Sequence, residues 1–118
     1  MTDVRIVRGD VDGVDVVHLE GELDLTNANV LTETFHETSA PSVVLDLTGV
    51  TFLDSMAVRA LDAGHRNLVA ERRDLVIVSP PDTPAAWTLR VAGLADDLVR
   101  ESLDAALASV ASRRATDL

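Results

Sequence analysis

The sequence predicts one α/β domain, in which about four helices pack on a mixed central sheet of four to five strands. Residues 43–47 and 75–78 are almost entirely apolar, as is typical of strands that are covered on both faces. A segment with helical spacing follows each of them, and this alternation favours parallel strands joined by crossover connections. The domain is assigned to residues 1–112, and residues 113–118 are expected to fray.

The N-terminal part is predicted to form an antiparallel hairpin. Residues 4–8 and 15–20 alternate polar and apolar side chains, as half-exposed strands do. The segment between them, residues 9–13, reads GDVDG, which is a turn signal of the kind that joins neighbouring strands. Residues 21–24 then close the second strand.

A first helix is predicted to begin near Thr26, because Ala28, Leu31 and Phe35 follow at helical spacing along one face. This helix ends at residues 39–41, which read SAP, since a proline and the residue before it both resist helical continuation.

A second helix follows the strand at residues 43–47 and is predicted to run from Ser55 to about Ala70. Residues 72–74 turn the chain into the strand at residues 75–78. The latter strand leads into a polar, proline-rich loop, which separates it from the next helix.

The third helix is predicted to start with Thr83 as its N-cap and Pro84 as its first residue. Gly93 is its stop signal, because glycine adopts the left-handed conformation that commonly ends helices. Residues 98–100 are predicted to add a short edge strand, and Ser102 then caps a last helix.

Composition and charge exclude several classes of function. The chain has 118 residues, of which 47% are hydrophobic and 25% charged, as in ordinary soluble domains. Its net charge of −10 disfavours direct binding to nucleic acid or to anionic membranes and favours a protein partner with basic residues. There is no cysteine, and the three histidines form no i, i+4 pair, so neither a metal nor a cofactor is expected.

The expected compartment is the cytoplasm. The N-terminus shows no signal-peptide pattern, and no apolar run approaches the roughly 20 residues that would span a bilayer. Nothing in the sequence requires more than a monomer, although a weak dimer is compatible with it.

Ser55, preceded by Asp54, is the main candidate functional residue because it lies where a buried strand leads into a helix. Serine and aspartate near helix starts mostly cap unpaired amides. Asp54 is the better cap here, which leaves Ser55 at the first helical position with its hydroxyl free. That hydroxyl has three open roles, namely recognition by a partner, phosphorylation by a kinase, or a share in capping.

The helix after Ser55 has two distinct faces. A polar stripe at helical spacing consists of Ser55, Arg59, Asp62 and Arg66. The opposite face, predicted to lie on the sheet, consists of Ala57, Leu61, Gly64 and Leu68. Gly64 costs about 1 kcal/mol relative to alanine in a helix, so close packing on a strand is expected there. An apolar strip suited to docking a partner lies between the faces at Met56, Ala60 and Ala63.

A phosphate on Ser55 is expected to leave the fold intact. Helix N-terminal amides favour negative charge by about 0.3–1 kcal/mol. The phosphate would add about −1.5 to −2 charge to one spot on the surface, which suits a docking switch.

Other polar or unusual residues are weaker candidates. Glu20, Glu22 and Asp24 are predicted to be solvated on one exposed strand edge rather than paired as catalytic acid and base. Asp46 lies inside a buried strand, where backbone amides or the end of the sheet are expected to satisfy it, and a role in shaping the Ser55 loop is also open. Trp87 is predicted to pack against the domain.

Four segments in register resemble the signature of STAS domains, specifically of bacterial anti-sigma factor antagonists. The central segment is residues 45–55, LDLTGVTFLDS. The other three are residues 21–24, GELD, residues 76–80, VIVSP, and residues 91–94, VAGL. Together they cover nearly the whole chain, and the resemblance implies a STAS-like fold.

The resemblance also implies a partner-switching function in which the chain is not an enzyme. Unphosphorylated family members bind an anti-sigma factor that is also a serine kinase, and this frees the sigma factor to join RNA polymerase. The kinase uses ATP to phosphorylate the serine, here Ser55, and the antagonist dissociates until a serine phosphatase resets it. Asp54 carries over as the flanking residue.

This chain departs from the family pattern directly after Ser55. Family members have a small residue and then glycine, whereas this chain has Met56 and Ala57, and the difference bears on which kinase recognises the site. The predicted partner-binding residues surround Ser55 and follow its helix: Asp54, Ser55, Met56, Ala57, Arg59, Ala60, Asp62, Ala63, Arg66, Glu22 and Asp24.

Two other hypotheses are open. The chain is also compatible with a STAS-like, non-catalytic subunit of a lipid-transport ATPase or of a stress-sensing scaffold, in which Ser55 takes part in no kinase cycle. An enzyme with Ser55 as nucleophile would need a nearby base, and the chain contains no lysine and no histidine close to Ser55 in sequence.

Overall fold

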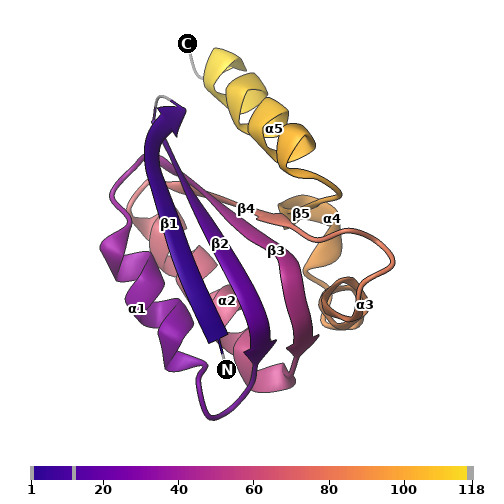
Figure 1. The fold of residues 1–118 in the computed structure, drawn as a ribbon. Helices are drawn as coiled ribbons and strands as arrows, with labels where there is room; N and C mark the ends of the chain where they lie inside the picture. Colours follow the sequence, from indigo (N-terminus) through magenta and orange to yellow (C-terminus); the bar gives the residue numbers. More distant parts are fainter. Residues whose placement is uncertain (1, 12, 117–118) are drawn as a thin grey trace.

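The computed structural model describes residues 2–11 and 13–116, which form a five-stranded sheet with helices on both faces (Figure 1). The elements follow one another in this order: β1 (Thr2–Val11), β2 (Val14–Leu23), α1 (Asn29–Glu37), β3 (Ser42–Leu53), α2 (Ser55–Ala70), β4 (Asp74–Val78), α3 (Pro84–Val91), α4 (Ala95–Leu98), β5 (Val99–Arg100) and α5 (Leu103–Thr116).

The sheet is mixed, as predicted. Its strand order is the sequence order β1-β2-β3-β4-β5. The β1 and β2 strands pair antiparallel as the predicted hairpin, and every later pair is parallel. The helices between the parallel strands provide the crossover connections that such pairing requires.

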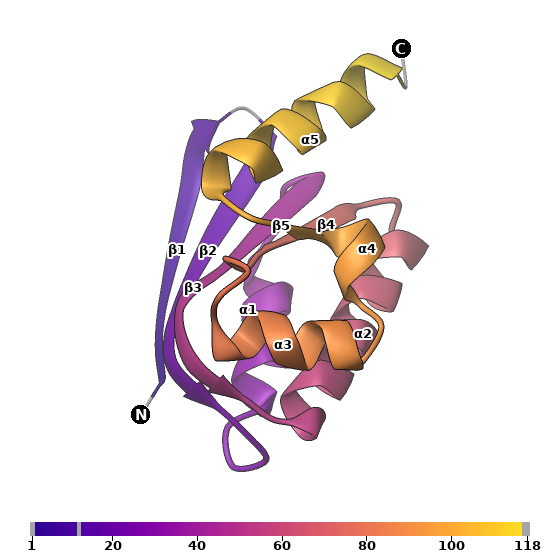
Figure 2. The ribbon, with the colours of Figure 1, turned by 90° about the vertical axis from the view of Figure 1, so that its right-hand side faces the viewer.

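The two faces of the sheet bury separate apolar clusters. Helices α1, α2, α3 and α4 lie on one side of the sheet, and α5 lies apart from them at one end (Figure 2). The larger cluster joins strand residues such as Leu45 and Ile77 to Leu61 of α2 and Leu89 of α3. The smaller cluster lies beneath α5 and consists of Val14, Val16, Val44, Val76, Val78, Ala106 and Val110. Strands buried on both faces explain the apolar runs in the sequence.

The first four strands are longer than predicted. The predicted turn at residues 9–13 contracts to the surroundings of Gly13, which has a φ of 73°, while Asp12 lies outside the described residues. β3 continues to Leu53, six residues past its predicted end, because its second half pairs with β2 alone. Most of that half is exposed, so it lacks the apolar run that marks the first half.

Helix α1 begins at Asn29, so the predicted start near Thr26 is wrong. The amide and the hydroxyl of Thr26 both donate to Oδ1 of Asp24, and this local bonding competes with helix formation. Leu31 and Phe35 nevertheless face the core as expected, since both are buried.

The C-terminal part of the chain confirms one prediction and differs from two. Thr83 and Ser102 act as the predicted caps, accepting from Ala86 N and Ala105 N. Leu98 ends the short helix α4 instead of starting the edge strand. Helix α5 extends to Thr116, past residue 113, where the frayed tail was predicted to start. Nη2 of Arg113 donates to the backbone carbonyl of Asp97 in α4 at 3.4 Å. Residues 117–118 lie outside the described part of the chain.

Candidate functional site

Asp54 organises the junction at which β3 leads into α2. Its Oδ1 accepts from the backbone N–H of Ala57 at 2.9 Å, which is the predicted N-cap of the helix. Its Oδ2 accepts from the backbone N–H of Leu25, also at 2.9 Å. One carboxylate therefore holds both the start of α2 and the loop that follows β2. Ser55 is the first residue of α2 and is exposed, as the sequence predicted.

The loop next to this junction is held by its own polar side chains. Asp24 accepts from the hydroxyl and the amide of Thr26, and these two bonds lower the pKa of the Asp24 carboxyl. The Asp24 N–H donates to Oδ1 of Asn27 at 2.8 Å, and Nδ2 of Asn27 donates to the Glu22 carbonyl at 2.8 Å. Glu22, near the end of β2, and Asp24, in the ordered loop that follows, were both predicted to bind the partner, and both lie beside the Asp54–Ser55 junction.

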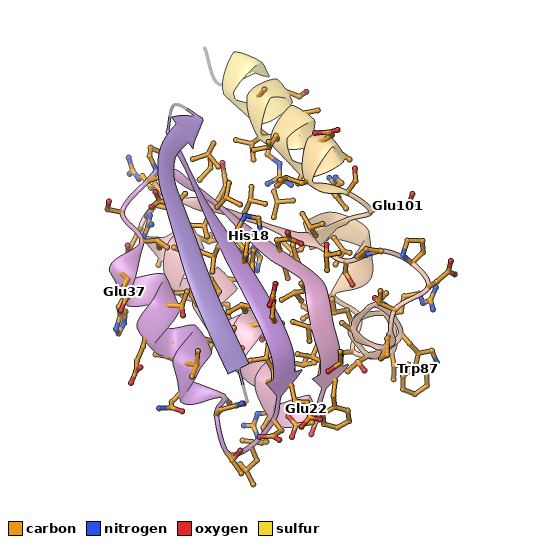
Figure 3. All side chains as sticks on the ribbon, in the orientation of Figure 1. His18, Glu22, Glu37, Trp87 and Glu101 are labelled. Carbon is orange, nitrogen blue, oxygen red and sulfur yellow. The ribbon has the colours of Figure 1, made fainter. Side chains whose placement is uncertain are left out.

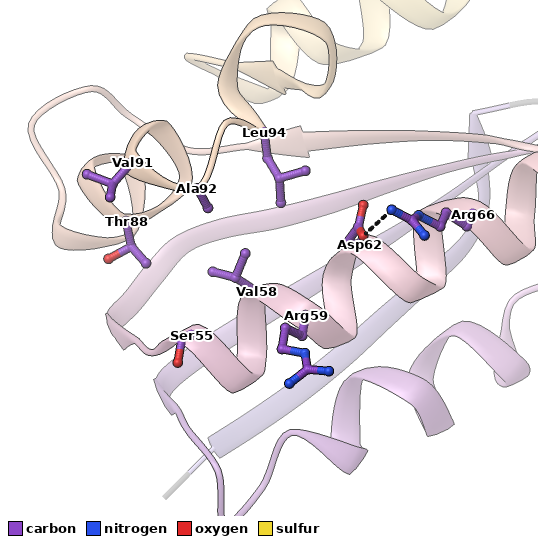
Figure 4. Close-up of a pocket in the computed structure, with 9 residues that line it drawn as sticks. All are labelled: Ser55, Val58, Arg59, Asp62, Arg66, Thr88, Val91, Ala92 and Leu94. Carbon is purple, nitrogen blue, oxygen red and sulfur yellow. Dashed lines mark ion pairs between the residues drawn. The ribbon is translucent and has the colours of Figure 1, made fainter.

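A cleft of about 610 Å³ lies between α2 and the segment from α3 to α4 (Figure 4). We call it the α2–α3 cleft. Its α2 side contains all four residues of the predicted polar stripe. Its full lining consists of Ser55, Val58, Arg59, Asp62, Arg66, Thr88, Val91, Ala92 and Leu94.

The two arginines of the α2–α3 cleft differ in their partners. Nη2 of Arg66 lies 3.2 Å from Oδ2 of Asp62, one turn earlier on the helix. The Arg66 side chain is 77% exposed and that of Asp62 is 38% exposed, so solvent screens this i, i+4 pair, which contributes only about 0.3–0.5 kcal/mol. Arg59 is exposed and forms no ion pair with any residue in the described part of the chain. Its guanidinium is thus available to a ligand or partner.

The predicted apolar strip lies on the other side of α2. Met56 and Ala60 are half-buried, and Ala63 lines a separate hollow of about 330 Å³ on the side of α1. None of the three lines the α2–α3 cleft, because their helical positions turn them toward α1. The structure therefore brings Ser55, Arg59, Asp62 and Arg66 together and separates them from the strip.

The apolar wall of the α2–α3 cleft was not predicted. It comes from Val58 and from Val91, Ala92 and Leu94, which follow in the chain only after another strand. Val58 borders the polar stripe on the helical wheel, so it is the residue of this apolar wall that the sequence pattern of α2 could have identified. The contribution of α3 depends on the tertiary fold and has no local signature.

Several large apolar side chains lie on the surface around these sites. Trp87 is 62% exposed and points away from α3 (Figure 3), so the prediction that it packs against the domain is wrong. Val91, one turn later on the same helix, is 69% exposed. Leu25 is 67% exposed, and its backbone N–H is bonded to Asp54; Phe52 is 48% exposed and lies two residues before Asp54. Exposed apolar groups of this kind mark interaction surfaces.

Asp46 is satisfied by neighbours in the sheet rather than by the Ser55 junction. Its Oδ1 accepts from the amide and the hydroxyl of Thr48, and its Oδ2 lies 2.8 Å from Nδ1 of His18. Burial by itself would raise the pKa of Asp46, but these hydrogen bonds outweigh it and lower the pKa. His18 and Asp46 thus form a polar pair between β2 and β3 (Figure 3 labels His18).

Within the described residues, no group of three or more histidine, cysteine or acidic side chains is placed to hold a metal ion. No helix in that part of the chain has both the length and the apolar character needed to cross a bilayer.

Comparison with known proteins identifies similar chains. The family model for the STAS domain matches residues 6–107. An anti-sigma factor antagonist from Mycobacterium paratuberculosis is 29% identical, with a TM-score of 0.78 over 93% of this chain and 94% of that one. Among curated protein sequences there is no match.

More distant structures share the fold alone. The anti-sigma factor antagonist SpoIIAA of Bacillus is 17% identical in its unphosphorylated form, with a TM-score of 0.72 over 93% of this chain and 97% of that one. Its phosphorylated form is 16% identical, with a TM-score of 0.63 over 92% and 99% of the two chains. A sulfate transporter family protein from Wolinella succinogenes is 19% identical, with a TM-score of 0.69 over 84% and 85%.

Proposed function

The chain belongs to the STAS domain family, and we propose that within this family it is an anti-sigma factor antagonist controlled by phosphorylation of Ser55. The observation that carries the proposal is the exposed Ser55 hydroxyl at the first residue of α2, in a junction held by Asp54. The similarity to the antagonist from Mycobacterium paratuberculosis supports it. The proposed setting is the cytoplasm, with the chain as a non-catalytic monomer.

In the proposed cycle, the unphosphorylated chain binds an anti-sigma factor that is also a serine kinase, and the sigma factor is released. The kinase transfers the γ-phosphoryl group of ATP to Oγ of Ser55, the hydroxyl proton is lost, and ADP leaves. The phosphorylated chain dissociates. A serine phosphatase then hydrolyses the phosphoester to inorganic phosphate and restores the hydroxyl.

The phosphate would act on the interface and not on the fold. Its charge of about −1.5 to −2 would lie at the amino end of α2, where the helix dipole favours it. In a complex, however, the same charge would be buried against a partner surface that has no matching cation. A loss of affinity on the order of 10³-fold requires about 4 kcal/mol, which an unmatched buried charge can supply.

The proposed docking surface surrounds Ser55. Exposed apolar side chains at Leu25 and Phe52 would provide contact area; the ordered loop at Asp24 would fix the position of Leu25, and β3 that of Phe52. Met56, half-buried beside Ser55, would narrow the choice of kinase.

The experiment that tests this proposal measures both phosphate transfer and binding. We expect intact-mass analysis to show one added phosphate after incubation with the cognate kinase and ATP, and none in Ser55→Ala. Ser55→Ala should remain bound to the kinase, whereas Ser55→Glu should bind on the order of 10³-fold more weakly. Thr32→Glu, which adds the same charge at an exposed position of α1, is the matched control and should bind as the wild type does. Wild-type affinity in both Ser55 variants would show that Ser55 is not the switch.

A second candidate function is a non-catalytic subunit of a transport assembly or a stress-sensing scaffold. The observation that favours this second candidate is the fold shared with the sulfate transporter family protein from Wolinella succinogenes. If the chain has this function, we expect no cognate kinase to phosphorylate Ser55. We also expect the chain to co-purify with a transport ATPase or a scaffold complex.

A further inference from the structure

The α2–α3 cleft combines apolar side chains with a cationic edge. Val58, Val91 and Leu94 contribute apolar side chains to its lining, and Arg59 and Arg66 lie along the α2 side (Figure 4). With Asp62 included, the charged side chains of the lining sum to +1, whereas the whole chain carries −10. The cleft is therefore a local exception to the charge of the molecule.

We propose that the α2–α3 cleft seats a helical segment of a partner protein that presents apolar side chains and, one turn away, a carboxylate that pairs with Arg59. This inference deepens the proposed function and rests on it in one respect, since it takes the partner to be the anti-sigma factor. The segment would lie between α2 and α3 with its apolar stripe on Val58 and Val91.

Charge complementarity is the first argument for this occupant. Arg59 is exposed and unpaired within the described residues, while Arg66 already pairs with Asp62. A guanidinium binds a carboxylate through two parallel hydrogen bonds, which gives orientation as well as attraction. Two arginines next to an aspartate do not form the run of cations that a phosphate backbone or an anionic bilayer requires.

The second argument is the shape of the apolar surface. Val91 is 69% exposed and Trp87, one turn earlier on α3, is 62% exposed, so the apolar surface extends from the cleft along the helix. A volume of about 610 Å³ lies in the range of sites that hold a sizeable ligand. Several side chains spaced along a helix use such an elongated surface better than a single inserted residue does.

The third argument is continuity with the switch residue, because Ser55 lines the same cleft. A phosphate on Ser55 would add about −1.5 to −2 charge and reverse the net charge of the lining. An acidic partner segment would then be repelled instead of attracted. The proposed occupant thus gives phosphorylation a direct electrostatic route to dissociation.

The test uses the unphosphorylated full chain and a phage-displayed library of random dodecapeptides, so that it does not depend on any kinase. We expect selected peptides to combine apolar residues with aspartate or glutamate at helical spacing. Their affinity should fall at least about tenfold in Arg59→Glu and several-fold in Val91→Ser. Arg90→Glu, an exposed arginine on α3 outside the cleft, is the matched control and should change affinity less than about twofold.

Circular dichroism establishes that each variant is folded; Val91 and Arg59 are both exposed, so their replacement removes little packing. Failure to select peptides, selection of basic peptides, or equal binding by Arg59→Glu would overturn the inference. Displacement of the peptides by a second copy of the chain, or binding of decanoate in their place, would overturn it in favour of those occupants. If the cleft binds the peptides but no kinase phosphorylates Ser55, the kinase cycle alone is rejected. If Ser55 is phosphorylated but the cleft binds no peptide, the inference about the cleft alone is rejected.

Discussion

At the level of single residues, Asp54 does two jobs with one carboxylate. One oxygen caps α2 through Ala57 N, and the other holds the N–H of Leu25 in the preceding loop. Capping was predictable from sequence, because it depends on residues three positions apart. The bond to Leu25 spans 29 positions and could only be seen in the folded chain. This second bond holds the backbone of Leu25 beside the Asp54–Ser55 junction.

Asparagine at position 54 should separate the capping of α2 from the hydrogen bond to Leu25. Asp54→Asn keeps an oxygen for Ala57 N but turns an amide toward Leu25 N, so one bond is lost and two donors face each other. We expect the free energy of unfolding to fall by about 1 kcal/mol in Asp54→Asn and by about 2 kcal/mol in Asp54→Ala. Urea denaturation measures this change.

Amide hydrogen exchange of Leu25 should also accelerate in both variants, because its acceptor is gone. Asp82→Asn, which removes a carboxylate from the exposed loop before α3, is the control and should leave Leu25 unchanged. Unchanged exchange at Leu25 in Asp54→Asn would contradict the double role of Asp54.

At the level of elements, the two faces of α2 were predictable but their neighbours were not. Ala57, Leu61, Gly64 and Leu68 are all buried, as their spacing indicated. Gly64, however, does not pack on a strand as predicted. Its closest contact is the aromatic ring of Phe35 on α1, where an added methyl group would overlap Cε2 and Cδ2 of the ring. Periodicity identifies a buried face but not the element that covers it.

Gly64→Ala is therefore expected to destabilise the protein although alanine is the better helix former. Alanine would gain about 1 kcal/mol from helix propensity, whereas overlap with Phe35 costs about 1–3 kcal/mol. We expect a net loss of about 1 kcal/mol in urea denaturation. In the double variant with Phe35→Leu the two effects should not add, because the smaller side chain removes the overlap. If Gly64→Ala were more stable than the wild type, α1 would have to shift and make room for the added methyl group.

At the level of the whole molecule, the order of strands and helices was predictable because its signals are local, except for the four-residue helix α4, which was not predicted. Apolar runs marked the buried strands, and Thr83 and Ser102 marked helix starts that the structure confirms. The second half of β3 was missed, since its exposed residues are not alternating. The α2–α3 cleft was only half predicted, because the stripe beginning at Ser55 is local to α2 whereas Val91 reaches it through the tertiary fold.

The acid stability of the whole molecule should depend on Asp46. Its folded-state pKa is lowered from 3.8, so its stabilising contribution is complete above that value and is lost as the pH falls through the folded pKa. Protonation of the many other carboxylates relieves the repulsion of a chain with a net charge of −10, which acts in the opposite direction. Comparison of variants at one pH cancels this shared effect.

We expect Asp46→Asn to be less stable than the wild type by about 1–2 kcal/mol near pH 7, because it weakens the bonds to Thr48 and His18. This difference should shrink as the pH falls well below 3.8, since the wild-type carboxyl then also becomes neutral. Urea denaturation at both pH values measures it, with exposed Asp82→Asn as the control that should stay within about 0.5 kcal/mol of the wild type. A difference for Asp46→Asn that stays constant across this range would mean that the charge of Asp46 does not stabilise the sheet, and that its hydrogen bonds act through geometry alone.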